Sequence, residues 1–181
     1  MKIISGKLKG RIIDNYNIDG TRPTMDRVKE SVFATIQDYV SDSIFLDLFS
    51  GTGNIGIEAI SNGASFCYFV DNNKEATNVI KNYVSKFNIE SNSCILNKDY
   101  ISALNYFVDN NIGFDIIYLD PPYKTNYINN IISFICDNNL LNSKGLVIIE
   151  NSDSSIIDNK NLVVLKNKKY GNKYITILKK E

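Results

Sequence analysis

The run Asp120-Pro121-Pro122-Tyr123 has the clearest chemical potential in this chain, and it directly follows the apolar segment 114–119. Proline cannot donate to a strand ladder and restricts the residue before it, so the run should end a strand abruptly. Only three prolines occur in the chain, and two of them lie here. The pattern predicts a stiff loop that presents one carboxylate, free carbonyls and an aromatic face. An ordinary Pro-rich turn is the structural alternative.

Such a loop suits the methylation of an amino group on a nucleobase. The amine of guanine or adenine is a poor nucleophile because its lone pair is delocalised into the ring. Hydrogen bonds to the Asp120 carboxylate and the Pro121 carbonyl would favour a pyramidal nitrogen, and the carboxylate would stabilise the charge that develops during attack. Tyr123 would stack on the base, which contributes about 1–3 kcal/mol in single-strand binding. We predict that Asp120, Pro121, Pro122 and Tyr123 are catalytic.

A glycine-rich loop follows the predicted strand 44–47, with glycines at 51, 53 and 56. This spacing satisfies the dinucleotide-binding pattern, which is weak evidence alone. Asp47 would repel a pyrophosphate but would favour a ligand that carries an ammonium group. The glycines would let the backbone approach such a ligand closely. The residues expected to bind this ligand are Asp47, Phe49, Ser50, Gly51, Thr52 and Gly53.

Two further carboxylates end the next two predicted strands. Asp71, beside Asn72, could accept hydrogen bonds from two ribose hydroxyls, and Asp99, beside Tyr100, could bind an adenine amino group. Each could instead be a helix N-cap or lie in an exposed turn. Because Asp47, Asp71 and Asp99 all come at carboxyl ends of successive strands, where ligands bind in such sheets, we expect a shared cofactor site.

The elements that position these residues alternate between strand and helix. Residues 2–13 predict two short strands around Ser5-Gly6, and Thr24 could N-cap a helix that runs to about Tyr39. Further strands are predicted at 44–47, 66–70, 94–96, 114–119 and 146–150, with helices at 55–62, 74–87, 100–109 and 126–138. The segments 162–166 and 174–178 predict a terminal hairpin.

This alternation predicts an α/β fold with a doubly wound, mostly parallel sheet. Five βα units and a terminal hairpin would give seven strands with the last one antiparallel, the Rossmann-like fold of S-adenosylmethionine-dependent methyltransferases. We expect residues 1–181 to form a single domain, with 1–20 as an N-terminal basic β-hairpin and 21–181 as the catalytic core. S-adenosylmethionine is therefore the expected cofactor.

The composition excludes several classes of chemistry. Histidine is absent, so no mechanism can use a His base and no His-containing metal site can form. The three cysteines have no zinc spacing and are typical of a reducing compartment, and we expect no metal. No apolar run approaches the roughly 20 residues of a membrane span, and the N-terminus lacks a signal-peptide core. We expect a cytoplasmic protein without a membrane partner, and the size favours a monomer.

The net charge of zero hides a strong pattern. Residues 1–30 carry seven Lys or Arg against four Asp or Glu, a net charge of +3, and residues 160–181 carry seven against one, or +6. The middle, 31–159, carries six against fifteen, or −9. Two basic ends on an acidic body indicate a local footprint for an anionic partner such as nucleic acid, although solvated charged tails would give the same counts.

The chain resembles the RsmD-type methyltransferases, which modify N2 of a guanine in 16S ribosomal RNA. The resemblance rests on four segments: 3–11 (IISGKLKGR), 21–30 (TRPTMDRVKE), 46–53 (LDLFSGTG) with Gly56 and Glu58, and 119–123 (LDPPY). It implies that Arg22 and Thr24 lie near the cofactor. It also implies RNA contacts on the basic extension and a substrate within the small ribosomal subunit. We assign the RNA contacts to Lys2, Lys7, Lys9 and Arg11 of the extension and to Arg27 of the segment that follows it. Tyr123 and Ser50 depart from the Phe and Ala common in the family.

Other functions remain open on the residues alone. A DNA or RNA adenine N6-methyltransferase also uses Asp-Pro-Pro-Tyr, although the DNA enzymes normally need a sequence-reading region that has no room here. A protein-glutamine N5-methyltransferase favours Asn in place of Asp120 and carries a separate helical domain. In a dinucleotide oxidoreductase, residues 120–123 would have no function. A non-catalytic RNA-binding relative would have lost the cofactor carboxylates, which are present here.

Overall fold

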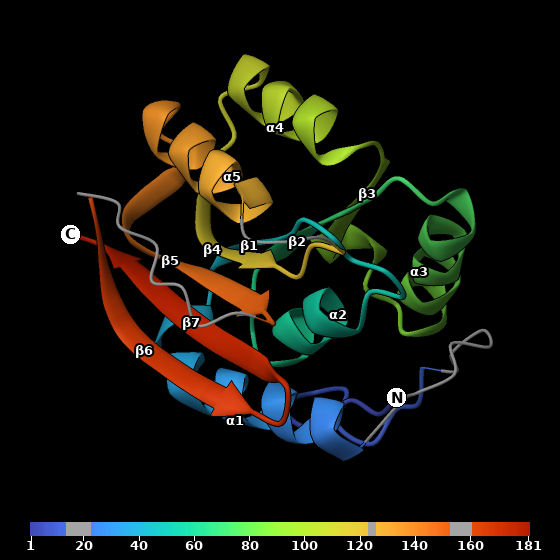
Figure 1. Cartoon of the computed structure of the whole chain (residues 1–181). Helices are drawn as coiled ribbons and strands as arrows, with labels where there is room; N and C mark the ends of the chain where they lie inside the picture. Colours follow the sequence, from blue (N-terminus) through green and yellow to red (C-terminus); the bar gives the residue numbers. More distant parts are fainter. Residues whose placement is uncertain (14–22, 123–125, 153–160) are drawn as a thin grey trace.

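The computed structural model describes residues 1–13, 23–122, 126–152 and 161–181, without the side chains of residues 23–25 and 126. It contains a seven-stranded sheet in the order β3-β2-β1-β4-β5-β7-β6 (Figure 1). The strands are β1 (Ile44–Asp47), β2 (Phe66–Asp71), β3 (Ser93–Asn97), β4 (Phe114–Leu119), β5 (Leu141–Asn151), β6 (Leu162–Tyr170) and β7 (Lys173–Lys180). The helices are α1 (Pro23–Val40), α2 (Asn54–Ser61), α3 (Lys74–Lys86), α4 (Tyr100–Asp109) and α5 (Asn126–Asp137), with a 3₁₀ turn, η1, at Glu90–Asn92.

Strands β1 to β5 pair in parallel, and β7 runs antiparallel to both β5 and β6. The sequence therefore predicted the fold class correctly, because each strand and helix carries its own period in the sequence. The reversed strand places the turn between β6 and β7 at the carboxyl edge of the parallel strands.

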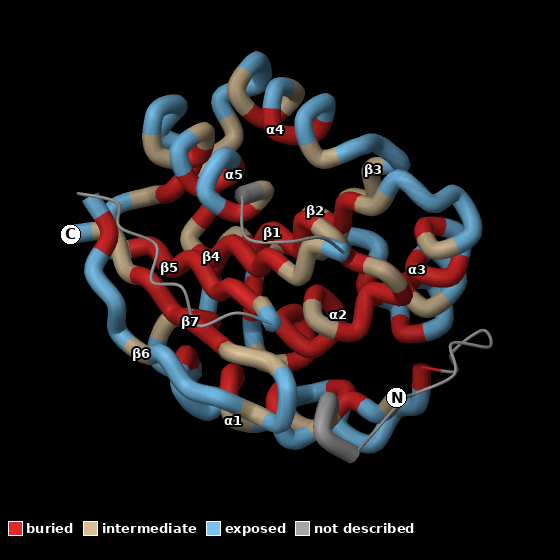
Figure 2. Tube along the Cα trace, viewed as in Figure 1, coloured by how far each residue is buried: buried red, intermediate tan, exposed pale blue. Residues whose placement is uncertain are grey.

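Successive side chains of the strands point to opposite faces of the sheet, and each face is covered by helices. Phe45, Phe69 and Ile116 pack with residues of α1, α2 and α3 on one face. Leu46 and Ile117 pack with α4 and α5 on the other. Figure 2 shows the resulting buried sheet between two helical layers.

The chain leaves β1 and β4 towards opposite faces, since β1 leads into α2 and β4 leads towards α5. These strands are neighbours in the sheet, and Asp47 pairs with Tyr118. In open α/β sheets ligands bind outside the carboxyl ends of the strands at such a switch point. The two loops singled out by the sequence therefore flank the position where this fold binds ligands.

Three local expectations need correction. Helix α1 begins at Pro23, so Thr24 lies inside the helix and is not its N-cap; proline fits the first helical position because its missing N–H would be unpaired there anyway. Strand β5 begins at Leu141 and not at 146 because a bulge separates two stretches that both pair with β4. The N-terminal hairpin reduces to one antiparallel bridge, Lys2 with Ile12, around a wider turn than the predicted Ser5-Gly6.

The N-terminal segment 1–13 is nonetheless anchored to the core. The backbone N–H groups of Ile4 and Ser5 donate to the Glu58 carboxylate at 2.9 Å each, and the Lys7 N–H donates to the Ser61 carbonyl at 2.8 Å. Ile3 lies in the core. Because Glu58 and Ser61 belong to α2, the basic extension packs against the helix that follows the glycine loop. Across the described residues, no helix has the length and apolar character needed to cross a membrane.

Candidate functional site

The loop after β1 is held in shape by the hydroxyl of Ser50. Its Oγ donates to the Asp47 carbonyl at 2.6 Å and accepts from the Val70 N–H at 2.9 Å, which links β1 to β2. Gly51 and Gly53 have φ values of 51° and 80°, a left-handed conformation that favours glycine. The predicted cofactor loop is therefore a turn whose backbone geometry requires its glycines.

Asp47 is buried at the end of β1, and its Oδ2 accepts the Gly56 N–H at 3.0 Å. The pKa of this carboxyl is raised to about 7, mainly by burial; the Gly56 hydrogen bond lowers it, and the nearby carboxylates of Asp120 and Asp71 add to the rise. A buried carboxyl among other acids is stabilised in its charged form by a cation. The geometry thus fits a ligand that brings an ammonium group to Asp47.

Asp71 and Asp99 end β2 and follow β3, as the sequence placed them. The Asp71 carboxylate accepts the Gly51 N–H and the Asn73 N–H, both at 2.8 Å, so it ties the glycine loop to β2. Asp99 N-caps α4 through the Ser102 N–H at 3.0 Å and the Ser102 hydroxyl, whose hydrogen bond is the main cause that lowers the Asp99 pKa. The capping alternative is therefore realised at Asp99, and its predicted contact with adenine stays a prediction.

An aromatic row borders the glycine loop. Phe49 lies 5.9 Å from Tyr100, and Tyr100 lies 4.6 Å from Tyr127, measured between ring centroids. Such rings offer flat apolar surface of the kind that binds a base. Tyr127 was missed from the sequence because it belongs to α5, far along the chain from the loop. Its position inside an amphipathic helix gave no motif that could have singled it out.

Asp120 directly follows β4 and comes two residues after Tyr118, the residue of β4 that pairs with Asp47. About 40% of its side chain is exposed. Burial of the remainder and the neighbouring Glu150 raise its pKa to about 7, against the lowering effect of Lys173. Pro121 is half-buried and Pro122 exposed, while Tyr123 lies outside the described residues. The structure thus brings the carboxylates of the two motifs to neighbouring strand ends.

Glu150 and Lys173 extend this site beyond the predicted motifs. Lys173, the first residue of β7, contacts Glu150 at the end of β5 through an ion pair and lies 3.8 Å from the Asp120 carboxylate. The Tyr118 hydroxyl donates to the second Glu150 oxygen at 2.8 Å. The sequence could have indicated Glu150, because it is an acidic residue at the end of an apolar strand, like Asp47 and Asp71. Lys173 follows the turn of a hairpin and has no comparable signal.

The structure describes only some of the residues in the N-terminal 30 that are predicted to bind RNA or to lie near the cofactor. Lys2, Lys7, Lys9, Arg11 and Arg27 are all exposed. Arg22 lies outside the described residues, as does the side chain of Thr24. Asn72 is exposed beside Asp71, and Thr52 is buried in the glycine loop.

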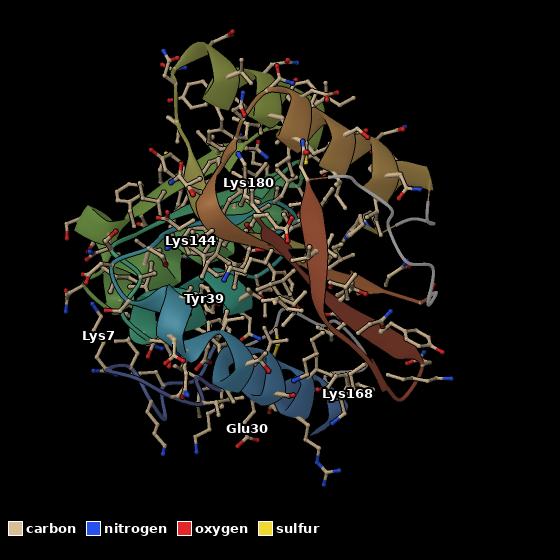
Figure 3. All side chains as sticks on the ribbon, turned by 90° about the vertical axis from the view of Figure 1, so that its left-hand side faces the viewer. Lys7, Glu30, Tyr39, Lys144, Lys168 and Lys180 are labelled. Atoms are coloured by element: carbon tan, nitrogen blue, oxygen red, sulfur yellow. The ribbon has the colours of Figure 1, made fainter. Side chains whose placement is uncertain are left out.

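Both basic ends of the chain contact α1. Lys29 of α1 donates to the Lys2 carbonyl at 2.7 Å, and Thr35 of α1 accepts from Lys166 of β6 at 2.6 Å. Figure 3 shows Lys7 and Lys168 near opposite ends of α1 in that view, with Glu30 on the helix between them. The extension and the β6–β7 hairpin therefore flank one helix, although they are distant in sequence.

A different hollow, of about 300 Å³, opens at the amino edge of the strands, with Asp115 and Lys144 in its lining. It lies at the opposite edge from Asp47 and Asp120, and Asp115 already accepts hydrogen bonds from the Ile44 N–H and the Asn142 amide. We therefore assign the site to the carboxyl edge. Within the described part of the chain, no three potential metal ligands gather.

Known proteins are similar to this chain in sequence and in fold. A family model described as "Conserved hypothetical protein 95" matches residues 1–179. The chain belongs to this family, that of the RsmD-type methyltransferases. The "Ribosomal RNA small subunit methyltransferase D" of Haemophilus influenzae is 34% identical over 173 residues, which cover 94% of this chain and 89% of that protein.

Solved structures agree with the assignment of the fold. The crystal structure of HI0767 from Haemophilus influenzae has a TM-score of 0.81 and 30% identity, and the match covers 99% of this chain and 97% of that one. The crystal structure of SMU.776, complexed with SAH, has a TM-score of 0.67 at 15% identity and covers 81% of this chain and 49% of that one. This chain therefore has the Rossmann-like fold of S-adenosylmethionine-dependent methyltransferases, as its sequence predicted.

Proposed function

We propose that this protein is a methyltransferase that transfers a methyl group from S-adenosylmethionine to the N2 amine of a guanine in 16S ribosomal RNA. The observation that carries the proposal is the meeting of Asp120-Pro121-Pro122 with the Asp47 glycine loop at the β1/β4 switch point. The family relatives named ribosomal RNA small subunit methyltransferase D support the choice of ribosomal RNA.

The residues around the glycine loop fit S-adenosylmethionine. Its ammonium group would face Asp47, whose raised pKa marks a buried carboxyl in need of a cation. The Asp71 carboxylate would accept the ribose hydroxyls, while Phe49 and Tyr100 would contact the adenine ring, and Asp99 its amino group. When bound, the cofactor supplies an electrophilic methyl group on a sulfonium centre.

The chain's own part in the reaction is to prepare the amine. The target base leaves its stack to reach the loop after β4. The Asp120 carboxylate accepts one amine hydrogen and the Pro121 carbonyl accepts the other, which favours a pyramidal nitrogen with its lone pair directed at the methyl group. As the nitrogen becomes positive, the preorganised carboxylate stabilises it and then receives the released proton. Ionised Asp120 is therefore the competent form.

The finer assignment to guanine N2 rests on the family resemblance, since the Asp-Pro-Pro-Tyr loop serves adenine N6 equally well. A substrate held in the assembled or assembling small subunit is the expectation from the same resemblance. Two basic ends that flank α1 would suit a folded RNA whose phosphates lie on both sides of the target base.

The testing experiment incubates the protein and labelled S-adenosylmethionine with small ribosomal subunits that lack the modification. Naked 16S RNA serves as a second substrate in parallel. The RNA is digested and the labelled nucleoside is identified by mass spectrometry. We expect labelled N2-methylguanosine, with more label on subunits than on naked RNA. Labelled N6-methyladenosine, or label on ribosomal protein alone, would contradict the assigned substrate but would leave the proposed amino-group chemistry intact.

A further inference from the structure

Three charged side chains, Glu150, Lys173 and Asp120, lie next to one another at the carboxyl edge of the sheet, where β4 and β5 end and β7 begins. Glu150, at the end of β5, retains only 9% of its side-chain exposure, and both of its oxygens are engaged. Oε2 accepts from the Tyr118 hydroxyl at 2.8 Å, and Oε1 pairs with the Lys173 ammonium. Lys173 is in turn 3.8 Å from Oδ2 of Asp120.

The reversed strand of the fold makes this arrangement possible. Because β7 runs antiparallel, it begins at the edge where β4 and β5 end, and Glu150 pairs with Ile175 in the register. Lys173 therefore starts its strand beside the residues that close β4 and β5. A parallel strand in its place would begin at the opposite edge of the sheet, so its first residue could not lie beside Asp120.

We propose that Lys173 is a positioning residue for the reaction: held by Glu150, it keeps the Asp120 carboxylate ionised and turns one of its oxygens away, so that the other accepts the substrate amine. This role rests on the proposed function, in which ionised Asp120 is the competent form. Lys173 acts through Asp120 and need not touch the substrate.

The protonation state of Asp120 depends on the charged and titratable groups around it. Asp47 faces it from β1, Glu150 from β5, Lys173 from β7, and Tyr118 precedes it on β4. Asp47 and Glu150 are carboxyls, whereas the Tyr118 phenol stays neutral because burial raises its pKa, so the ammonium of Lys173 is the cation among these neighbours. It carries a raised pKa because its carboxylate neighbours outweigh the effect of burial, and it stays charged throughout the range where Asp120 titrates.

Two substitutions distinguish a positioning role from a structural one because they should act in opposite directions. Lys173→Met removes the cation, so the acid limb of the pH profile of kcat/KM should move to higher pH by about one unit or more. Glu150→Gln removes a negative neighbour but keeps an acceptor for Tyr118, so the same limb should move to lower pH. Lys173→Arg should restore a profile close to that of the unaltered protein.

Lys81→Met, on the exposed face of α3, is the matched control and should leave the profile unchanged. Cofactor affinity, measured by calorimetry, checks that each variant is folded. A merely structural role predicts that Lys173→Met and Glu150→Gln lower the rate at every pH without a shift of the acid limb. That result, or shifts of both variants in the same direction, would overturn the proposal.

A second readout needs no activity. The Asp120 carboxyl can be titrated by carbon-13 NMR in the protein without substrate, with Asp120→Asn used to assign its signal. We expect the Asp120 pKa to rise in Lys173→Met and to fall in Glu150→Gln. If the protein methylated no RNA but these shifts occurred, the proposed function would fail, while the control of Asp120 ionisation by Lys173 would stand. An Asp120 pKa that is the same in all variants would refute that role directly.

Discussion

Lys29 and Glu58 form an ion pair of 2.9 Å that is sealed from solvent, with 1% and 0% of their side chains exposed. Lys29 comes from α1 and Glu58 from α2, and each belongs to a different segment of the family resemblance. The ammonium also donates to the Asn54 side chain at 2.8 Å, at the start of α2 directly after the glycine loop. One buried pair thus joins the basic extension, α1 and the helix behind the cofactor loop.

We expect Lys29→Met to destabilise the protein by about 3–5 kcal/mol, the range found when one member of a buried ion pair is removed. The physical reason is that Glu58 would remain buried with its charge uncompensated. The free energy of unfolding in denaturant measures the effect, and Lys81→Met on exposed α3 is the control. The double variant Lys29→Met/Glu58→Gln should recover part of the loss. A loss no larger than that of the control would show that the pair contributes little.

Asp120→Ala should abolish turnover while cofactor binding persists. The carboxylate stabilises charge on the amine nitrogen only during transfer, so we expect at least about a 100-fold loss of kcat, as for the removal of one electrostatic stabiliser. Methylation rates and calorimetric affinity for S-adenosylmethionine are the two measurements. Asp109→Ala, at the exposed end of α4, is the matched control because it makes the same change outside the site. A near-normal rate would remove Asp120 from the mechanism.

Asp47 should make the ligand-free protein less stable as the pH rises. Its pKa is about 7 in the folded protein against 3.8 for the ordinary side chain, so between these values the folded protein holds a proton that the unfolded chain has released. Stability then falls with rising pH, by at most about 1.4 kcal/mol per unit for one proton. Unfolding of Asp47→Asn between pH 5 and pH 7 should lack this part of the slope. Parallel pH curves for both proteins would contradict the assignment.

The same carboxyl should release a proton when the cofactor binds. An ammonium group beside Asp47 stabilises its charged form, so binding near pH 6 should expel about one proton per site. Calorimetry in buffers with different ionisation enthalpies counts the protons. Asp47→Asn should release none and bind the cofactor about 10- to 100-fold more weakly, as expected for the loss of a charged hydrogen bond. Equal proton release by both proteins would exclude Asp47 as the ammonium partner.

Gly6 and Gly10 offer a matched test of how the extension is held. Both have positive φ, 74° and 88°, so an alanine is strained at either position by about 1–2 kcal/mol. A Cβ at Gly6 would lie 1.8 Å from the Ser61 carbonyl oxygen, whereas a Cβ at Gly10 would meet nothing within 4 Å. Gly6→Ala should therefore also release residues 1–13 from α2, seen as faster amide exchange at Ile4 and Ser5. Equal exchange in both variants would show that this contact does not anchor the extension.

The sequence determined the place in the fold of most of the candidate site residues. The strand and helix periods are local, so the order of elements could be predicted, and Asp47, Asp71 and Asp120 were placed at strand ends because each follows an apolar run. Asp99 was also placed correctly, but its capping bond with Ser102 could not be chosen in advance over a ligand contact. The start of α1 at Pro23 follows the local preference of proline for the first helical position, but the sequence could not give the bulge in β5, since it depends on the pairing with β4.

Only the tertiary structure decided which charged side chains contact one another. Glu58 accepts hydrogen bonds from residues more than 50 positions away, and Lys173 reaches Asp120 because β7 inserts between β5 and β6 in the reverse direction. Local patterns specify which face of an element is buried, but not which distant element covers it. A charged side chain has no periodic signal for its partner. The energy of such a pair depends on distance and burial, and both are fixed only when the sheet is assembled.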